Sequence, residues 1–258
     1  MKKALLVGIN DYPGTFNDLL GCVNDVRNMC GVLTSYFGFA KENINILTDR
    51  NATTFNITKA LEMLVHEAKS GDFLVFHYSG HGSQVPDTNG DEKDRLDEII
   101  CPYDLDWQSN VIRDDDLSKV FESVPAGVHI EVILDSCHSG TGSRTAGSGY
   151  CRKRFLPLPE KFLPKESTSR KVTPIKPEKI QVLWAACRAN QFAADAYIGG
   201  KYGGAFTTSL CESLAATKGQ MGRYDLLKSV QEKLKKDGFK QAPQLETSRK
   251  FKKAPFLG

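Results

Sequence analysis

Short apolar runs alternate with amphipathic stretches along this chain, and this alternation constrains its fold more than any other feature. Several runs are apolar on both faces, which is typical of strands in a parallel sheet that helices cover. Between and after them, other stretches place apolar residues three or four positions apart, as on one face of a helix. The pattern predicts a doubly wound α/β fold. The predicted strands are 4–9, 44–47, 73–78, 98–101, 130–134 and 182–186, and the predicted helices are 26–37, 57–68, 117–124, 206–216 and 224–234.

The composition is that of an ordinary folded protein. The chain has 258 residues, 40% of them hydrophobic, and a net charge of +3. That charge is too small to indicate nucleic-acid binding, and no apolar stretch approaches the length of a membrane span. The apolar run after the first lysines is too short for a signal peptide, and the seven cysteines show no CxxC spacing. We therefore expect a cytoplasmic protein with reduced thiols that binds neither nucleic acid nor membranes.

Two segments differ from the rest in charge. Residues 87–116 hold eleven acidic and three basic residues. Residues 151–179 hold nine basic and three acidic residues together with five prolines, and they show no periodicity. The second segment is typical of an exposed linker or a long loop.

Two of the predicted strands end in reactive side chains. The stretch FLVFHYSGHG (73–82) places His81 just beyond one strand, and VILDSCHSG (132–140) places Cys137 just beyond another. Sites in open α/β sheets gather beyond the carboxyl ends of the strands, so the two side chains can meet across one cleft. A thiol is a strong nucleophile only as the thiolate, and an imidazole can take its proton. We therefore predict Cys137 as the nucleophile and His81 as the base.

Backbone groups near these residues suit the same chemistry. The N–H groups of Gly82 and Cys137 are the predicted donors to an oxyanion. His138 neighbours Cys137 in the chain, but adjacent residues near a strand end point to opposite sides, so we assign it a secondary role. His77 lies within its strand and is predicted to be a hydrogen-bonded core histidine. A lone cysteine after a strand is usually a buried thiol, but a paired histidine after a second strand argues against that reading here.

Several motifs resemble one known family. The chain carries HYSGHG at 77–82 and DSCHSG at 135–140, with ALLVGINDY at 4–12, GCVNDV at 21–26 and GGAFT at 203–207. In these motifs it resembles the caspase-like cysteine peptidases of clan CD, family C14, and most closely the metacaspases and their bacterial relatives, the orthocaspases. The resemblance covers most of the chain, and the His and Cys motifs are its most specific part.

The resemblance implies a caspase-type α/β fold, in which helices flank a six-stranded, mostly parallel sheet. It implies one peptidase domain over 1–258, with a large-subunit-like part at 1–150, a linker at 151–179 and a small-subunit-like part at 180–258. It also implies a cysteine endopeptidase that requires no cofactor and acts on proteins or peptides. We expect a monomer or a weak oligomer.

The resemblance further implies an acidic specificity pocket formed by Asp25, Ser79 and Asp135. The spacing supports this, since Ser79 and Asp135 lie two positions before His81 and Cys137, and a period of two places each pair on one side. A carboxylate near the thiolate is unfavourable by about 2–3 kcal/mol at an effective dielectric of about 20, and a substrate cation would offset this repulsion. We therefore predict cleavage after Arg or Lys.

The acidic segment raises the question of calcium. An EF-hand loop needs Gly at its sixth position, where Glu92 stands, so we exclude that motif. The resemblance instead maps a calcium site onto Asp97, Asp114 and Asp115. The family's fourth carboxylate falls on Arg144, so we predict weak or absent calcium dependence.

Basic residues after the Cys137 strand offer sites for self-processing. They lie between the two subunit-like parts, where caspase-like chains are commonly processed, and they are the residues that the predicted pocket would accept. The candidate self-cleavage residues are Arg144, Arg152, Arg154 and Arg170, with Lys153 and Lys171 beside them.

Two other functions were weighed against a peptidase. The first is a catalytically silent caspase-fold interaction module, which the complete Cys137 and His81 pair argues against, because a scaffold needs neither. The second is a thiol hydrolase of small amides, which the acidic pocket and the basic linker argue against.

Overall fold

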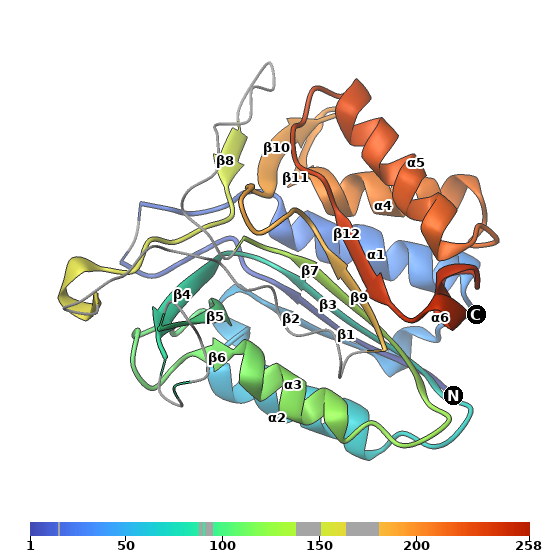
Figure 1. Ribbon diagram of the computed structural model, residues 1–258, viewed down its shortest axis with the longest axis horizontal. Helices are drawn as coiled ribbons and strands as arrows, with labels where there is room; N and C mark the ends of the chain where they lie inside the picture. Colours follow the sequence, from blue (N-terminus) through green and yellow to red (C-terminus); the bar gives the residue numbers. More distant parts are fainter. Residues whose placement is uncertain (15, 88–89, 91–94, 138–150, 164–180) are drawn as a thin grey trace.

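The computed structural model describes residues 1–14, 16–87, 90, 95–137, 151–163 and 181–258. Its centre is a six-stranded sheet in the order β12-β9-β7-β3-β1-β2 (Figure 1). All neighbours pair in parallel except β12, which runs antiparallel to β9. This confirms the predicted mostly parallel sheet. The strands are β1 (Lys2–Gly8), β2 (Ile44–Thr48), β3 (Phe73–Ser79), β7 (His129–Asp135), β9 (Val182–Ala185) and β12 (Gln244–Thr247).

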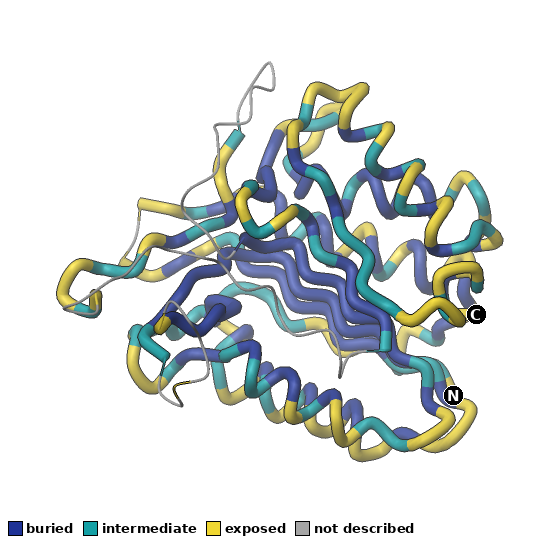
Figure 2. Tube along the Cα trace, in the orientation of Figure 1, coloured by how far each residue is buried: buried dark blue, intermediate teal, exposed yellow. Residues whose placement is uncertain are grey.

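Helices cover both faces of this sheet (Figure 1). One face carries α1 (Cys22–Tyr36), α4 (Ala205–Ala216) and α5 (Arg223–Lys236), and the other carries α2 (Thr54–His66) and α3 (Asp114–Glu122). The inner strands β9, β7, β3 and β1 are mostly buried, whereas the edge strands β2 and β12 are partly exposed (Figure 2). Successive side chains of a strand point to opposite faces, so β3 contributes apolar side chains to both faces of the sheet. Each face has its own apolar cluster. Among the helices of the described residues, none is long and apolar enough to cross a membrane.

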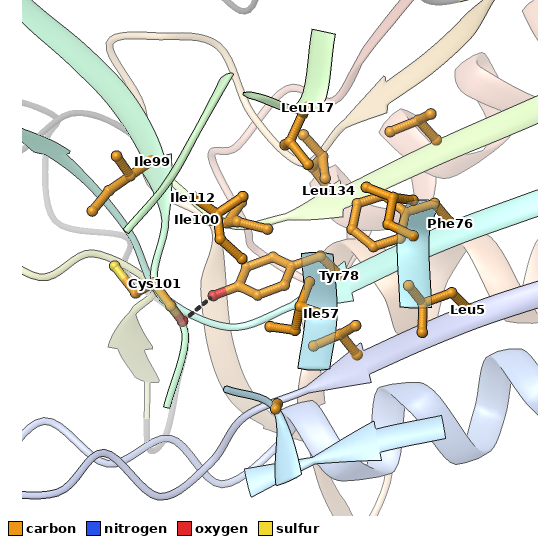
Figure 3. Packing of buried hydrophobic residues seen from close by; sticks show 14 of the residues in the cluster. Leu5, Ile57, Phe76, Tyr78, Ile99, Ile100, Cys101, Ile112, Leu117 and Leu134 are labelled. Atoms are coloured by element: carbon orange, nitrogen blue, oxygen red, sulfur yellow. Dashed lines mark hydrogen bonds between the residues drawn. The ribbon is translucent and has the colours of Figure 1, made fainter. Parts of the chain in front are cut away.

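Tyr78 of β3 shows how the core leads into the edge of the sheet. It lies in the apolar cluster on the α2 and α3 side, beside residues such as Phe76 and Leu134 (Figure 3). Its single hydroxyl proton lies between two carbonyl acceptors, that of His81 at 2.6 Å and that of Cys101 at 2.9 Å. A buried phenol needs such partners, and here they hold the chain that follows β3 in place.

Two small sheets flank the carboxyl ends of the central strands. One contains β4 (Gly82–Pro86), β5 (Leu96–Ile100) and β6 (Ile112–Arg113), and the other contains β8 (Cys151–Lys153), β10 (Ala194–Ile198) and β11 (Lys201–Gly204). The remaining short elements are α6 (Arg249–Lys252) and the 3₁₀ turns Lys41–Asn43, Asp49–Asn51 and Glu160–Phe162.

Two predictions about the fold need correction. The apolar run at 98–101 forms β5 of a small antiparallel sheet, whereas the sixth central strand is β12. The sequence of β12 gave no strand signal because it is an edge strand whose four residues are all half-buried. The segment 151–163, expected to be part of an exposed linker or long loop, differs from that expectation at Arg154 and Leu156, which are buried. Residues 164–179 lie outside the described residues.

A buried ion pair connects the sheet to the end of the chain. Glu131 of β7 accepts hydrogen bonds from Trp184 Nε1 on β9 and from Arg223 Nε at the start of α5, both at 2.7 Å. Arg223 also donates to the carbonyls of Phe251 and Ala254. The carboxylate and the guanidinium are both nearly inaccessible to solvent. Each therefore depends on the other for its charge to be tolerated.

We expect Glu131→Ala to lower the free energy of unfolding by about 3–5 kcal/mol, because it leaves a buried guanidinium unpaired. The matched control is Lys119→Ala, which removes one member of an exposed pair with Asp116 on α3. The control should change the free energy of unfolding by less than about 1 kcal/mol. Urea unfolding of both variants measures this, and equal effects would contradict the role given to Glu131.

Candidate active site

The register of β3 and β7 places both predicted residues at one edge of the sheet. The two strands are parallel neighbours, and Ser79 lies opposite Asp135 at their carboxyl ends. His81 and Cys137 each follow two residues later, so both lie at the same edge of the sheet. Both are almost fully buried, with exposed fractions of 1%. Strand register thus explains why both residues lie at the same edge of the sheet.

The environment of His81 fixes which ring nitrogen carries the proton. Its Nε2 lies 2.6 Å from the backbone carbonyl of Asn17, which can only accept, so Nε2 is the protonated nitrogen. Its Nδ1 is buried and has no hydrogen-bond partner among the described residues. Burial lowers the pKa of His81 to about 4, so the ring is neutral at pH 7. The result is an imidazole whose Nδ1 lone pair is available to a proton.

Two tyrosines hold the backbone of His81. The hydroxyl of Tyr12 accepts from the His81 N–H at 2.9 Å, and its ring lies 4.7 Å from the imidazole between centroids. Tyr78 donates to the His81 carbonyl from the other side. Gly80 is required between them, because a Cβ there would collide with both phenolic oxygens. The glycine in the motif YSGHG therefore has a packing role.

Cys137 lies beside the start of β10. Its Sγ accepts a hydrogen bond from the backbone N–H of Ala193. A second thiol, that of Cys187, is close by. A hydrogen bond with Cys137, together with burial, raises the pKa of Cys187 well above its usual range. The protonated Cys187 is thus a neighbour of the nucleophile candidate and not a competing thiolate.

Three carboxylates and one hydroxyl form a buried acidic pocket next to this pair. They belong to Asp25 at the start of α1, Ser79 of β3, Asp135 of β7 and Asp195 of β10, and all four are fully buried. The first, second and third of these were predicted, whereas Asp195 was not. Asp195 lies in the motif AADA at 193–196, which is part of the resemblance to the family. The motif alone does not indicate a role for the Asp195 carboxylate.

Backbone N–H groups and one hydroxyl support the carboxylates. Gly204 donates to Asp25 at 2.9 Å, the Thr207 N–H and hydroxyl donate to Asp135 at 3.0 and 2.7 Å, and Gly21 donates to Asp195 at 2.9 Å. Burial, and then the charge of Asp135, raise the pKa of Asp25 to about 6. These donors stabilise negative charge in the pocket. The positive charge that balances it comes from a residue outside α1, β3, β7 and β10.

The side chain of Arg154 supplies that cation. Its Nη2 lies 2.7 Å from Asp25 Oδ2 and 3.1 Å from Asp195 Oδ1, and its Nη1 lies 3.2 Å from Asp135 Oδ2. Nη1 also donates to the Ser79 hydroxyl at 2.6 Å. The guanidinium is therefore matched to the pocket through both of its terminal nitrogens.

The backbone of Arg154 is held as firmly as its side chain. Its carbonyl accepts from the N–H groups of Gly82 and Cys137, at 3.1 Å each, and its own N–H donates to Ala193 at 3.1 Å. The preceding strand β8 pairs antiparallel with β10, and Phe155 forms a parallel bridge with Gly82. The two N–H groups predicted to bind an oxyanion thus point at one carbonyl oxygen of the chain itself.

The other predicted site residues have separate outcomes. His77 is buried and its Nε2 lies 3.3 Å from the Thr207 hydroxyl, which confirms the core histidine. Arg152 is exposed and donates to the Asp18 carbonyl instead of entering the pocket. His138, Arg144 and Arg170 lie outside the described residues. Gly204 was given no separate role from the sequence, although it lies in the motif GGAFT. In the structure a Cβ at this position would collide with Asp135 and Arg154, so the pocket requires glycine there.

The residues suggested for calcium do not form a complete set of ligands in the described part of the chain. Arg113 Nε donates to Asp97 Oδ2 at 2.9 Å, which occupies one carboxylate oxygen. Burial, and then the charge of Asp87, raise the pKa of Asp97 to about 6. Within the described ranges, no three His, Cys, Asp or Glu side chains gather closely enough to hold a metal ion. We therefore derive no step through calcium.

Comparisons with known proteins assign the family. The model of the metacaspase, peptidase C14 domain matches residues 2–144. Metacaspase-1A from Aspergillus fumigatus is 33% identical over 288 aligned positions, covering 96% of this chain and 68% of the relative. The chain belongs to the metacaspases. Metacaspase-7 from Arabidopsis thaliana is 50% identical over 145 residues, which cover 54% of this chain and 35% of that relative, so this metacaspase chain spans about a third of the plant protein's length.

Solved structures agree on the fold. A protein from Geobacter sulfurreducens matches with a TM-score of 0.71 at 24% identity, over 98% of this chain and 96% of its own. Caspase-1 from Spodoptera frugiperda matches with a TM-score of 0.60 at 16% identity, over 95% and 86%. The fold is caspase-like, and the family is one of cysteine-type endopeptidases.

For this metacaspase we expect weak or absent calcium dependence. The ion pair between Asp97 and Arg113 would have to break before the carboxylate could bind a cation with both oxygens. Turnover of metal-stripped protein should change less than about twofold when calcium is titrated in. A many-fold rise in turnover that is absent in both Asp97→Ala and Asp114→Ala would contradict this.

Proposed function

We propose that this chain is a cysteine endopeptidase that cleaves proteins after Arg or Lys, with Cys137 as nucleophile and His81 as base. The observation that carries the proposal is the docking of Arg154. Its guanidinium fills the acidic pocket while its carbonyl oxygen accepts from Gly82 and Cys137. A residue before a scissile bond must satisfy both conditions at once: a specificity pocket for its side chain and oxyanion donors at its carbonyl.

The chemistry follows from this arrangement. His81 Nδ1 accepts the thiol proton, and the Cys137 thiolate attacks the carbonyl carbon of the substrate's basic residue. The N–H groups of Gly82 and Cys137 bind the oxygen as it becomes negative. The protonated imidazole then gives its proton to the leaving amine as the peptide bond breaks, which leaves a thioester. Water, deprotonated by the same imidazole, attacks the thioester and releases the carboxylic acid and the thiol.

The charges of the pocket favour Arg over Lys. Asp25 and Asp195 share Nη2 of Arg154, whereas Asp135 and Ser79 contact Nη1. A guanidinium presents two terminal nitrogens in a fixed planar fork, whereas an ammonium is a single point charge on a flexible four-carbon stem. Lys can therefore satisfy one side of the pocket but not both.

The docked segment also supports self-processing between Arg154 and Phe155. Among the candidates that the structure describes, Arg154 occupies the pocket, and Arg152 and Lys153 are exposed. The bond after Arg154 is the one whose carbonyl meets the oxyanion donors. The alternative of a silent interaction module is not favoured, because it gives no reason to hold a peptide carbonyl against the thiol-bearing residue.

We expect purified wild type to convert into two fragments, the second of which begins at Phe155. Cys137→Ala should stay whole, because the thiolate and its base act as a unit. Arg154→Gln should block this cut, since a neutral amide leaves three carboxylates without a cation. Gel electrophoresis and N-terminal sequencing measure both outcomes.

The matched control for that experiment is Arg152→Gln, which changes a basic residue two positions earlier in the same segment. It should be cut after Arg154 at the wild-type rate within about twofold, because its side chain lies outside the pocket. A new N-terminus at Lys153 in the wild type would show that another register is used for cleavage.

We expect an arginyl reporter peptide to have a kcat/KM at least about tenfold above that of the lysyl reporter. Asp195→Asn should lower kcat/KM for the arginyl reporter by about 10–100-fold, because a hydrogen bond between charged groups is lost and the amide offers one oxygen where the Leu20 and Gly21 N–H groups now use two. The charge-matched control is Asp116→Asn on the exposed surface of α3. Equal turnover of an aspartyl reporter by the wild type would overturn the pocket assignment.

A further inference from the structure

Leu156 is buried immediately beyond the bond that Arg154 precedes. Along this segment Arg154 and Leu156 point into the protein, Phe155 is half-buried and Pro157 is exposed. Leu156 is 3% exposed and belongs to the apolar cluster on the α2 and α3 face of the sheet. An extended chain alternates its side chains in this way, so one strand presents a cation to one site and an apolar side chain to another.

The backbone of Leu156 is held by the start of β4. Its N–H donates to the Gly82 carbonyl at 3.0 Å, and its carbonyl accepts a hydrogen bond from the buried Ser83 hydroxyl. The Gly82 N–H meanwhile donates to the Arg154 carbonyl. One residue of β4 therefore contacts the chain on both sides of the Arg154–Phe155 bond. These contacts are to backbone atoms, so they would hold any extended peptide in the same register.

Leu156 belongs to an apolar cluster that also includes residues of the small sheet β4-β5-β6. The cluster that includes Leu156 also contains Val85 of β4, Ile99 and Ile100 of β5, and Ile112 of β6. Leu158, two residues further on, packs partly against the same cluster. Because the Leu156 backbone is bonded to Gly82 and Ser83 at the start of β4, these members of the sheet β4-β5-β6 provide an apolar surface beyond the reacting bond.

We propose that this surface is a second specificity subsite, which selects an apolar side chain of the size of Leu at the second residue after the cleaved bond. The inference deepens the proposed function and rests on it, because it assumes that substrates bind as residues 151–158 do. Preferred substrates then carry a basic residue, any residue, and a large aliphatic residue in succession. A charged residue at the third position of that series would have to be buried without a partner.

The test uses processed wild-type protein and three internally quenched peptides. The parent peptide has the sequence of residues 152–158, and the variants carry Leu156→Asp or the matched change Pro157→Asp at the exposed neighbour. We expect Leu156→Asp to lower kcat/KM by about tenfold or more, since the burial of an aliphatic side chain is lost. Pro157→Asp should stay within about threefold of the parent. Equal losses for the two variants would overturn the subsite.

A fourth substrate separates this inference from the proposed function. It is an arginyl reporter with no residues after the cleaved bond. Turnover of the reporter together with equal turnover of the three peptides would overturn the subsite and leave the peptidase proposal standing. No turnover of any substrate would overturn both. On the protein side, Ser83→Ala should lower kcat/KM for the parent peptide severalfold more than for the reporter, because the reporter has no carbonyl for Ser83 to bind. An equal decrease for both substrates would argue against the subsite.

Discussion

The fit between one guanidinium and three buried carboxylates is the interaction on which the arrangement of this site depends. Asp25, Asp135 and Asp195 come from α1, β7 and β10, which are far apart in the chain, and each would be strongly unfavourable as an isolated buried charge. Each also accepts hydrogen bonds from backbone N–H groups that are already in place. The elements around the pocket are therefore organised to hold negative charge, and Arg154 completes the balance. Burial first, and then the charge of Asp135, still raise the pKa of Asp25 to about 6 in the presence of this cation.

Strand register explains why so much of the site could be predicted from the sequence. In a parallel sheet, neighbouring strands end at one edge, and Ser79 and Asp135 are direct partners there. A count of two residues from each partner then gives His81 and Cys137. The same period of two that predicts a strand thus links a pocket residue to a reactive residue on each strand. Local pattern was sufficient because each reactive residue follows the last residue of its strand by two positions.

The contacts that could not be predicted are those between distant segments. Arg154 meets Asp195 across 41 positions and Asp25 across 129, and no local pattern encodes such a distance. A period of two would place Arg152 and Arg154 on the same side, yet the first is exposed and the second is buried. The difference arises because β8 ends at Lys153, after which the backbone turns its hydrogen bonds toward Ala193, Gly82 and Cys137. The composition of the segment indicated a solvated linker, because composition carries no information on these hydrogen bonds to distant residues.

The segment around Arg154 connects the two small sheets. Before Arg154 the chain pairs with β10 in antiparallel fashion, and after it the chain bridges to Gly82 of β4 in parallel fashion. The segment therefore joins the sheet β11-β10-β8 to the sheet β4-β5-β6, and the Arg154 carbonyl lies where the two meet. Hydrogen bonds on both sides fix the position of that carbonyl more tightly than the side-chain pocket could alone, since the guanidinium is attached through a flexible stem. A chain bound there must be extended over several residues, so an Arg held within a helix could satisfy the acidic pocket but could not present its carbonyl to Gly82 and Cys137.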